Sequence, residues 1–92
     1  MKIIWSEQAK TSYIKSIDDL LKRWTIDIVI KFEILTNNTL DNLKKNKHFC
    51  PESQLTKLRK CIVHKNISLI YRIGELNIEL ITFIDNRSEH QY

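Results

Sequence analysis

The chain has 92 residues, enough for one domain, and its 42% hydrophobic content with a single glycine and a single proline excludes a disordered or loop-rich protein. Its net charge of +4 favours an anionic partner, either nucleic acid or an acidic protein. No apolar run approaches the roughly 20 residues of a membrane span, and the Met1–Trp5 start is too short for a signal peptide, so we expect a cytoplasmic protein without a membrane partner.

The first quarter of the chain predicts a strand and a helix. Residues 2–5 are β-branched and aromatic, which is typical of a strand. Ser6 is a good helix N-cap, with Glu7 in the first turn. Apolar residues then recur at helical spacing, and this pattern predicts a helix from about Ser6 to Arg23.

A second helix follows almost at once. Thr25 can cap it, and its apolar stripe continues to about Leu43 or Lys45. The β-branched residues 26–30 are also compatible with a strand, but a stripe of about five turns favours the helix. The short connection predicts an antiparallel helix hairpin.

The rest of the chain predicts a loop and three antiparallel strands. The loop spans residues 46–54, with Phe49 expected to point inward and Pro51 stopping any helix. The strands are expected at residues 55–64, 67–73 and 78–85, joined by turns at Lys65-Asn66 and 74–77. The order β-α-α-β-β-β predicts an α+β fold, with the helix hairpin packed on one face of a small, mainly antiparallel twisted sheet.

Alternation along the strands separates two faces of this sheet. If Lys65-Asn66 is the hairpin tip, Cys61 pairs with Ile70, and Arg59 with Arg72. The apolar face that should carry the helices is then Leu69, Tyr71, Ile73, Leu80, Ile62 and Ile84. The other face is mixed, with the row Arg59, Arg72 and Glu79, and is partly open to solvent.

The row of charges has two interpretations. Arg72 beside Glu79 is an ordinary cross-strand ion pair, worth at most about 1 kcal/mol. Alternatively, the neighbouring guanidiniums of Arg59 and Arg72 hold a phosphate or an acidic partner between them.

Cys50 and Cys61 are the only cysteines. Two cysteines can pair, but without an export signal we expect them as thiols in a reducing cytosol. Neither has a second cysteine or a histidine at metal-ligand spacing, so we expect no zinc site. His48 and His64 are expected on the solvated surface, and Trp5 and Trp24 in the core or between the helices.

The last residues carry three chemically useful side chains. Arg87 can hold a phosphate, and His90 can transfer a proton near neutral pH. Tyr92 can stack on a base. The alternative for His90 and Tyr92 is a solvated, frayed terminus.

The order and spacing of these segments resemble the RelE/ParE toxin superfamily over nearly the whole chain. The resemblance is carried by Leu58-Arg59-Lys60, by Leu69-Ile70-Tyr71-Arg72-Ile73 and by Ile78-Glu79-Leu80-Ile81-Thr82-Phe83-Ile84-Asp85-Asn86-Arg87. The Trp5-Ser6 start followed by two helices is similar to the family's N-terminal half. The resemblance implies the toxin of a bacterial toxin–antitoxin pair, neutralised by a cognate antitoxin that is acidic where it docks.

The family has two modes of action. RelE-like members cut mRNA in the ribosomal A site without a metal, using basic residues of the open sheet face and a C-terminal arginine and tyrosine. On this resemblance Arg59 falls where a first sheet lysine is expected, and Arg87 matches the C-terminal arginine. Tyr92 lies one residue short of the usual spacing, and His90 can substitute as the proton-transfer group.

ParE-like members block DNA gyrase and lack the cleavage residues. The sequence departs from the nuclease pattern at Cys61, where a second lysine is expected, and at Ser68, where an arginine is expected. Both departures favour the gyrase alternative. A third alternative is a basic binding module without toxicity that only forms a repressor complex.

The leading hypothesis is an mRNA endoribonuclease that needs no cofactor. Its expected catalytic residues are Arg59, Arg72, Arg87, His90 and Tyr92. Its expected RNA-binding residues are Lys44, Lys45, Lys47, Lys57 and Lys60, although the lysines that end the second helix also suit a solvated helix end. The antitoxin is expected to cover the helix hairpin or the open sheet face with a helix or strand.

Overall fold

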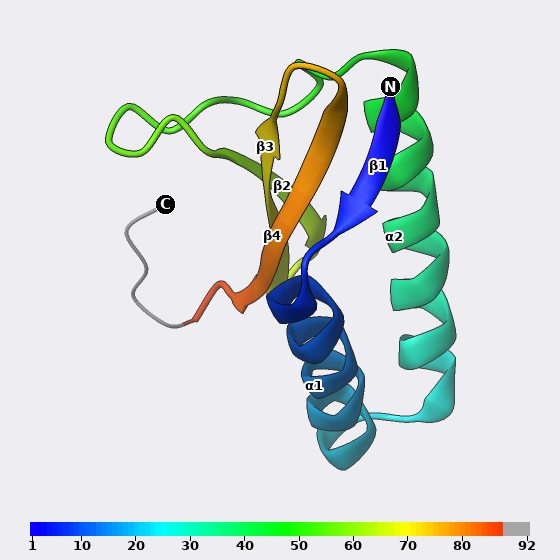
Figure 1. Ribbon diagram of the computed structural model, residues 1–92. Helices are drawn as coiled ribbons and strands as arrows, with labels where there is room; N and C mark the ends of the chain where they lie inside the picture. The colour runs from blue at the N-terminus through cyan, green and yellow to red at the C-terminus, as the bar shows by residue number, and fades with distance from the viewer. Residues whose placement is uncertain (88–92) are drawn as a thin grey trace.

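A computed structural model describes residues 1–87 of the chain, and its architecture is a helix hairpin against a four-stranded sheet (Figure 1). The predicted β-α-α-β-β-β order is confirmed. The elements are β1 (Lys2–Trp5), α1 (Glu7–Arg23), α2 (Ile26–Lys45), β2 (Arg59–His64), β3 (Ile67–Ile73) and β4 (Asn77–Asp85). The strand order is β1-β4-β3-β2, with β1 parallel to β4 and the other pairs antiparallel.

The cap predicted for α1 also joins the helix to the sheet. The Ser6 hydroxyl accepts a hydrogen bond from the Ala9 backbone N–H at 3.0 Å, which satisfies a donor left free at the helix start. The same hydroxyl donates to the Ile81 carbonyl oxygen at 2.9 Å, and the Ser6 N–H donates to the Leu80 carbonyl oxygen. One residue therefore fixes the angle at which the chain leaves β1 and enters α1 beside β4.

An aromatic cluster holds the helices on the sheet. Phe32 of α2 is fully buried, and its ring lies 5.4 Å from that of Tyr13 in α1 and 6.2 Å from that of Phe83 in β4, between centroids. Trp5 of β1 stacks on Phe83 at 5.8 Å. These rings come from every layer of the fold, so the cluster positions α1, α2, β1 and β4 together.

The predicted register of β2 on β3 is wrong by one residue. Arg59 pairs with Tyr71, and Cys61 pairs with Leu69. The ladder is irregular between Ile62 and His64, where a β-bulge adds a residue beside the Lys65-Asn66 turn and shifts every earlier pair.

This shift reassigns the faces of β2, and a second irregularity, in the ladder between β3 and β4, reassigns the end of β4. The covered face, which carries the helices, consists of Cys61, Val63, Leu69, Tyr71, Ile78, Leu80 and Phe83. The open face, which carries no helix, includes Lys60, Ile62, Ser68, Ile70, Arg72, Glu79 and Ile84, of which Ser68, Ile70 and Ile84 are buried. Ile62 and Ile84 were predicted on the covered face; Ile62 is instead 72% exposed, and Ile84 pairs with Ser68 after a second irregularity near Ile81.

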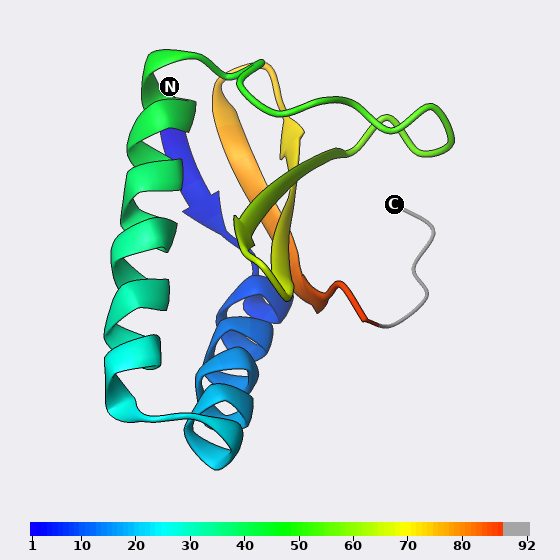
Figure 2. The same cartoon turned by 180° about the vertical axis from the view of Figure 1, so that it is seen from behind.

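The two cysteines form a disulfide, contrary to the expectation of free thiols. Cys50 and Cys61 lie 5.3 Å apart between Cα atoms, and both are buried. The corrected register turns Cys61 toward the covered face, where the start of the loop between α2 and β2 passes. The rest of this loop extends from the sheet on the side opposite to α2 (Figures 1 and 2).

One aromatic prediction and one strand boundary also fail. Phe49, expected to point inward, is 51% exposed; Trp24, expected in the core or between the helices, is 52% exposed at the end of α1. Strand β2 begins at Arg59 rather than near residue 55, because Ser53 and Leu58 close a hydrogen-bonded turn first. Within residues 1–87, neither helix has the length and apolar character needed to cross a bilayer.

Candidate functional site

Arg59 does not lie on the open face beside Arg72, as the sequence predicted. Its Nη1 donates to the Cys50 carbonyl oxygen at 2.7 Å, and its Nη2 lies 3.6 Å from a Glu52 carboxylate oxygen. Only 16% of the Arg59 side chain is exposed. The one-residue register shift turns this guanidinium toward the disulfide loop, where it stabilises the loop.

Arg72 lies on the open face and is mostly exposed. Its Nη2 donates to Glu79 Oε1 at 2.8 Å, so the predicted cross-strand ion pair is confirmed. With 59% of the arginine side chain exposed, this pair contributes at most about 1 kcal/mol. Lys60 belongs to the same face, because it pairs with Ile70 next to Arg72.

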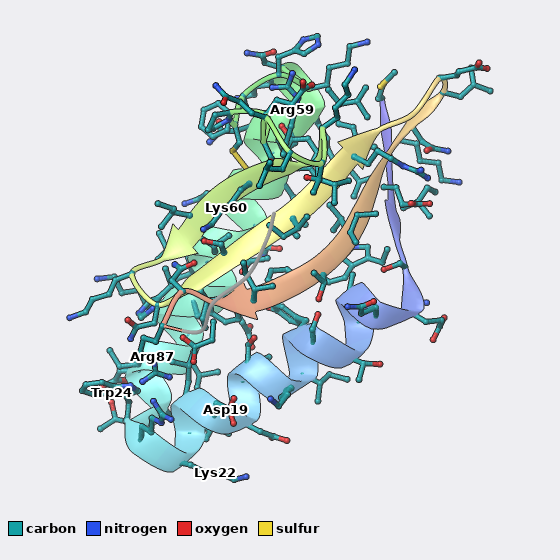
Figure 3. The ribbon with its side chains drawn as sticks, turned by 90° about the vertical axis from the view of Figure 1, so that its left-hand side faces the viewer. Asp19, Lys22, Trp24, Arg59, Lys60 and Arg87 are labelled. Atoms are coloured by element: carbon teal, nitrogen blue, oxygen red, sulfur yellow. A yellow bond between two sulfur atoms is a disulfide. The ribbon has the colours of Figure 1, made fainter. Side chains whose placement is uncertain are left out.

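Arg87 lies beyond the end of β4. Its Nε and Nη2 donate to the Asp85 carboxylate, the shortest contact being 2.6 Å from Nη2 to Oδ2. Asp85 pairs with Ile67 and Glu79 pairs with Arg72, so the two positions are five residue steps apart along β3, about 17 Å along a strand. Figure 3 shows Arg59 and Arg87 at opposite ends of the molecule. The three predicted catalytic arginines therefore do not surround one phosphate.

The predicted proton-transfer and stacking residues, His90 and Tyr92, lie outside the described residues.

The predicted RNA-binding lysines lie in two places. Lys44, Lys45 and Lys47 line a shallow hollow of about 350 Å³ at the end of α2, together with Met1 and His48. Lys57 is exposed in the loop before β2, with a φ of 61°, and Lys60 is on the open face. The structure brings the first three together and leaves the other two on the far side of the sheet.

Cys61 and Ser68 supply no cation to the open face. Cys61 is in the disulfide, and Ser68 is fully buried. The Ser68 hydroxyl donates to Asn86 Oδ1 at 2.6 Å, and the Asn86 backbone N–H donates to the Asn66 carbonyl oxygen at 2.7 Å. Asn86 thus anchors the chain next to Arg87, a role that the sequence reasoning missed although polar residues at two strand ends were its signal.

His64 is less solvated than predicted. Its ring meets the edge of Phe32 at 6.5 Å between centroids. Burial, with smaller contributions from the Lys31 and Lys65 charges, lowers the pKa of His64 below its usual value. The neutral imidazole is therefore the main form at pH 7.

The outer surface of the helix hairpin is apolar over a continuous stripe of α2. Ile26, Ile30 and Ile34 follow one another at four-residue spacing, and each is at least half exposed. Ile14 and Leu21 of α1 are also exposed. Such exposed apolar residues on a helix surface suit a helical partner, in line with the prediction that a partner covers the hairpin.

Residues 1–87 contain no group of three or more histidine, cysteine, aspartate or glutamate side chains that could hold a metal ion.

Comparison with known proteins identifies a fold. No protein-family model matches the sequence, and no curated protein matches it. Among solved structures, the fold is similar to that of a toxin from Helicobacter pylori, crystallised as a copper-bound mutant, with a TM-score of 0.66. The match covers 95% of this chain and 96% of that one at 15% identity, which shows a shared fold. The superfamily suggested by the sequence stays a prediction.

Proposed function

We propose that this chain is the toxin of a bacterial toxin–antitoxin pair. The observation that carries the proposal is the end-to-end similarity of its fold to that of the Helicobacter pylori toxin. The net charge of +4 and the sheet face left free of helices agree with a protein that acts on an anionic macromolecule.

Its leading mode of action is cleavage of mRNA on the ribosome. Arg87 past β4 is too far from Lys60 and Arg72 on the open face to serve the same phosphate, but the three suit successive phosphates of a single RNA strand. Lys44, Lys45 and Lys47 then contact ribosomal RNA from the end of α2.

The residues proposed to cleave the RNA belong to the last six residues of the sequence. Attack of a 2′-oxygen on phosphorus forms a cyclic phosphate and expels the 5′-oxygen, which needs a base, a cation beside the phosphorane and an acid. His90 takes or returns the proton, Arg87 offsets the developing charge, and Tyr92 stacks on a base. Arg59 has a positioning role, because it fixes the loop that precedes β2.

Inhibition of DNA gyrase without cleavage is the second candidate. It is favoured by the pairing of Arg72 with Glu79 and of Arg87 with Asp85, which reduces the charge offered to a phosphate. The disulfide-bonded Cys61 and the buried Ser68 point the same way.

In either mode the partner is an antitoxin that covers the apolar stripe of α2. Ile26, Ile30 and Ile34 offer anchors at the spacing of an amphipathic helix, and the basic charge of the chain favours an acidic docking segment.

The test is induction of the chain in bacteria, with mapping of transcript ends and a supercoiling assay in parallel. Cleavage predicts new transcript ends within codons of translated messages, and Arg87→Ala with His90→Ala should abolish them. Lys10→Ala with Lys15→Ala, which removes two exposed cations from α1, is the matched control and should leave cleavage unchanged. Intact transcripts with blocked supercoiling would establish the gyrase mode, and growth unaffected by induction would reject both modes.

A further inference from the structure

Trp24 is exposed at the junction of the two helices. It is the C-cap residue of α1, where its backbone N–H donates to the Leu20 carbonyl oxygen at 2.8 Å. The backbone at the cap is extended, and 52% of the residue is exposed. A large aromatic side chain left in water is typical of a binding surface.

Two adjoining hollows share Trp24 and Asn66 as walls. The narrow hollow has a volume of about 30 Å³ and lies between the last turns of α1 and the end of β4. The wider one, of about 170 Å³, lies between the start of α2 and the β2–β3 turn. Trp24 and Arg87 lie at this same end of the molecule in Figure 3, away from Arg59.

Basic side chains line both hollows together with Trp24. Arg23 and Arg87 line the narrow hollow, where Asp19 and Asp85 are the acidic residues. Lys65 lines the wider hollow with His64, whose pKa is lowered first by burial and then by the positive charges of Lys31 and Lys65. The neutral imidazole can donate or accept a hydrogen bond there.

Asp85 does not close the site to another anion. The side chains of Asp85 and Arg87 are 36% and 48% exposed, so water screens their ion pair and leaves it weak. Asp85 uses the Nε and Nη2 donors, whereas a guanidinium carries five N–H donors in all. Arg87 can therefore receive a phosphate oxygen while keeping its intramolecular partner.

We propose that the two hollows beside Trp24 form a nucleotide subsite, in which one base of a single-stranded RNA stacks on the indole and its phosphate contacts Arg23 and Arg87. A flat aromatic face between cations matches the two parts of a nucleotide, its base and its phosphate. The choice of RNA as the ligand rests on the proposed function, but the subsite requires neither cleavage nor the ribosome.

The direct test is binding of a fluorescein-labelled adenine hexaribonucleotide by the full chain. Stacking should quench indole fluorescence, and Trp24→Ala should weaken binding by about 5- to 100-fold. Trp24→Phe should restore most of the affinity, because it keeps an aromatic face. Arg23→Ala and Arg87→Ala should each lower the slope of log affinity against log salt by about 1.

Phe49→Ala is the matched control, since Phe49 is 51% exposed on the loop before β2 and should leave affinity unchanged. Circular dichroism of each variant separates lost binding from lost fold. Equal effects of Trp24→Ala and Phe49→Ala, or unquenched indole fluorescence, would overturn the subsite. So would a Trp24→Ala variant that binds RNA normally but loses a co-purified antitoxin, because the hollow then belongs to a protein partner.

Failure of the subsite is distinct from failure of the proposed function. Normal transcript cleavage by Trp24→Ala, with unchanged hexanucleotide affinity, rejects the subsite alone. Trp24-dependent RNA binding by a chain that cuts no transcript supports the subsite and rejects mRNA cleavage.

Discussion

The covered and open faces of the sheet arise from the same alternation of residues but differ in what they do. The covered face packs against Phe32 and the other aromatic rings, and its residues are fixed by close packing and by the disulfide. The open face carries Lys60, the exposed Ile62 and the exposed ion pair of Arg72. The comparison teaches that stability lies in the covered face, whereas the open face and the ends of the sheet are free to serve a partner.

The largest expected effect is on the covered face. Phe32→Ala should lower the free energy of unfolding by about 3–5 kcal/mol, because it removes a fully buried ring that contacts both Tyr13 and Phe83. Urea denaturation measures it. Phe49→Ala, at an exposed position, should lower the free energy of unfolding by under about 0.5 kcal/mol. Similar losses for the two variants would contradict the claim that stability lies in the covered face.

Loss of the disulfide should have the next largest effect on stability. Cys50 and Cys61 are 11 residues apart, and cross-linking a loop of this length is expected to add roughly 2–3 kcal/mol. A reductant should lower the denaturation midpoint of the natural chain and leave that of Cys50→Ala with Cys61→Ala unchanged. A natural chain that is insensitive to reductant would mean that the cysteines act as thiols.

A buried hydroxyl gives a smaller effect. Tyr71 is fully buried, and its hydroxyl donates to the Lys47 carbonyl oxygen at 2.8 Å and accepts from the Cys50 N–H at 3.4 Å. Tyr71→Phe leaves both backbone groups unpaired and should cost about 1–2 kcal/mol in thermal or urea unfolding. Unchanged stability would show that these groups find other partners.

The buried Tyr71 hydroxyl also predicts how the stability of the fold changes at high pH. Burial raises the pKa of Tyr71 in the folded state above its ordinary value of 10.0. The folded state thus keeps the proton longer than the unfolded one, so this contribution is complete below pH 10 and is lost as the pH rises further. The stability difference between the natural chain and Tyr71→Phe should therefore shrink above that pH.

Substituting the two sheet arginines compares a residue that stabilises the fold with one that is exposed on the open face. Arg59→Ala should cost about 1–3 kcal/mol of stability, because it removes a largely buried charged donor to the Cys50 carbonyl oxygen. Arg72→Ala should cost at most about 1 kcal/mol and instead reduce the salt dependence of RNA binding. Unfolding and RNA-binding titrations of both variants measure these effects. If Arg72→Ala costs more stability and Arg59→Ala has the larger effect on RNA binding, Arg59 belongs with the RNA-binding residues.

The smallest effect is the pH response of His64. Its pKa is lowered in the folded state, so the unfolded chain binds more protons as the pH falls below about 6.5. Its contribution is present above that pH and is lost as the pH falls through the folded-state pKa. His64→Gln should therefore lose less stability between pH 7 and pH 5 than the natural chain does. If the stability of both chains depends on pH in the same way, the His64 ring is fully solvated in the folded state.

Local chemistry was sufficient to predict the helices and their order. The Ser6 cap, the apolar stripes and the Lys65-Asn66 turn each act within a few residues, and α1, α2 and β3 match the expected bounds. The apolar content of the strands likewise predicted a sheet with one covered face.

The placement of the candidate site residues was decided by tertiary structure. A bulge between Ile62 and His64 turned Arg59 inward and Ile62 outward, and it adds only one residue that no local pattern marks. Sequence alone determined which segments become helices and strands, because capping and periodicity are local. Only the packed structure decided the register, the Cys50–Cys61 disulfide and the exposure of Trp24, because these depend on contacts between segments far apart in the chain.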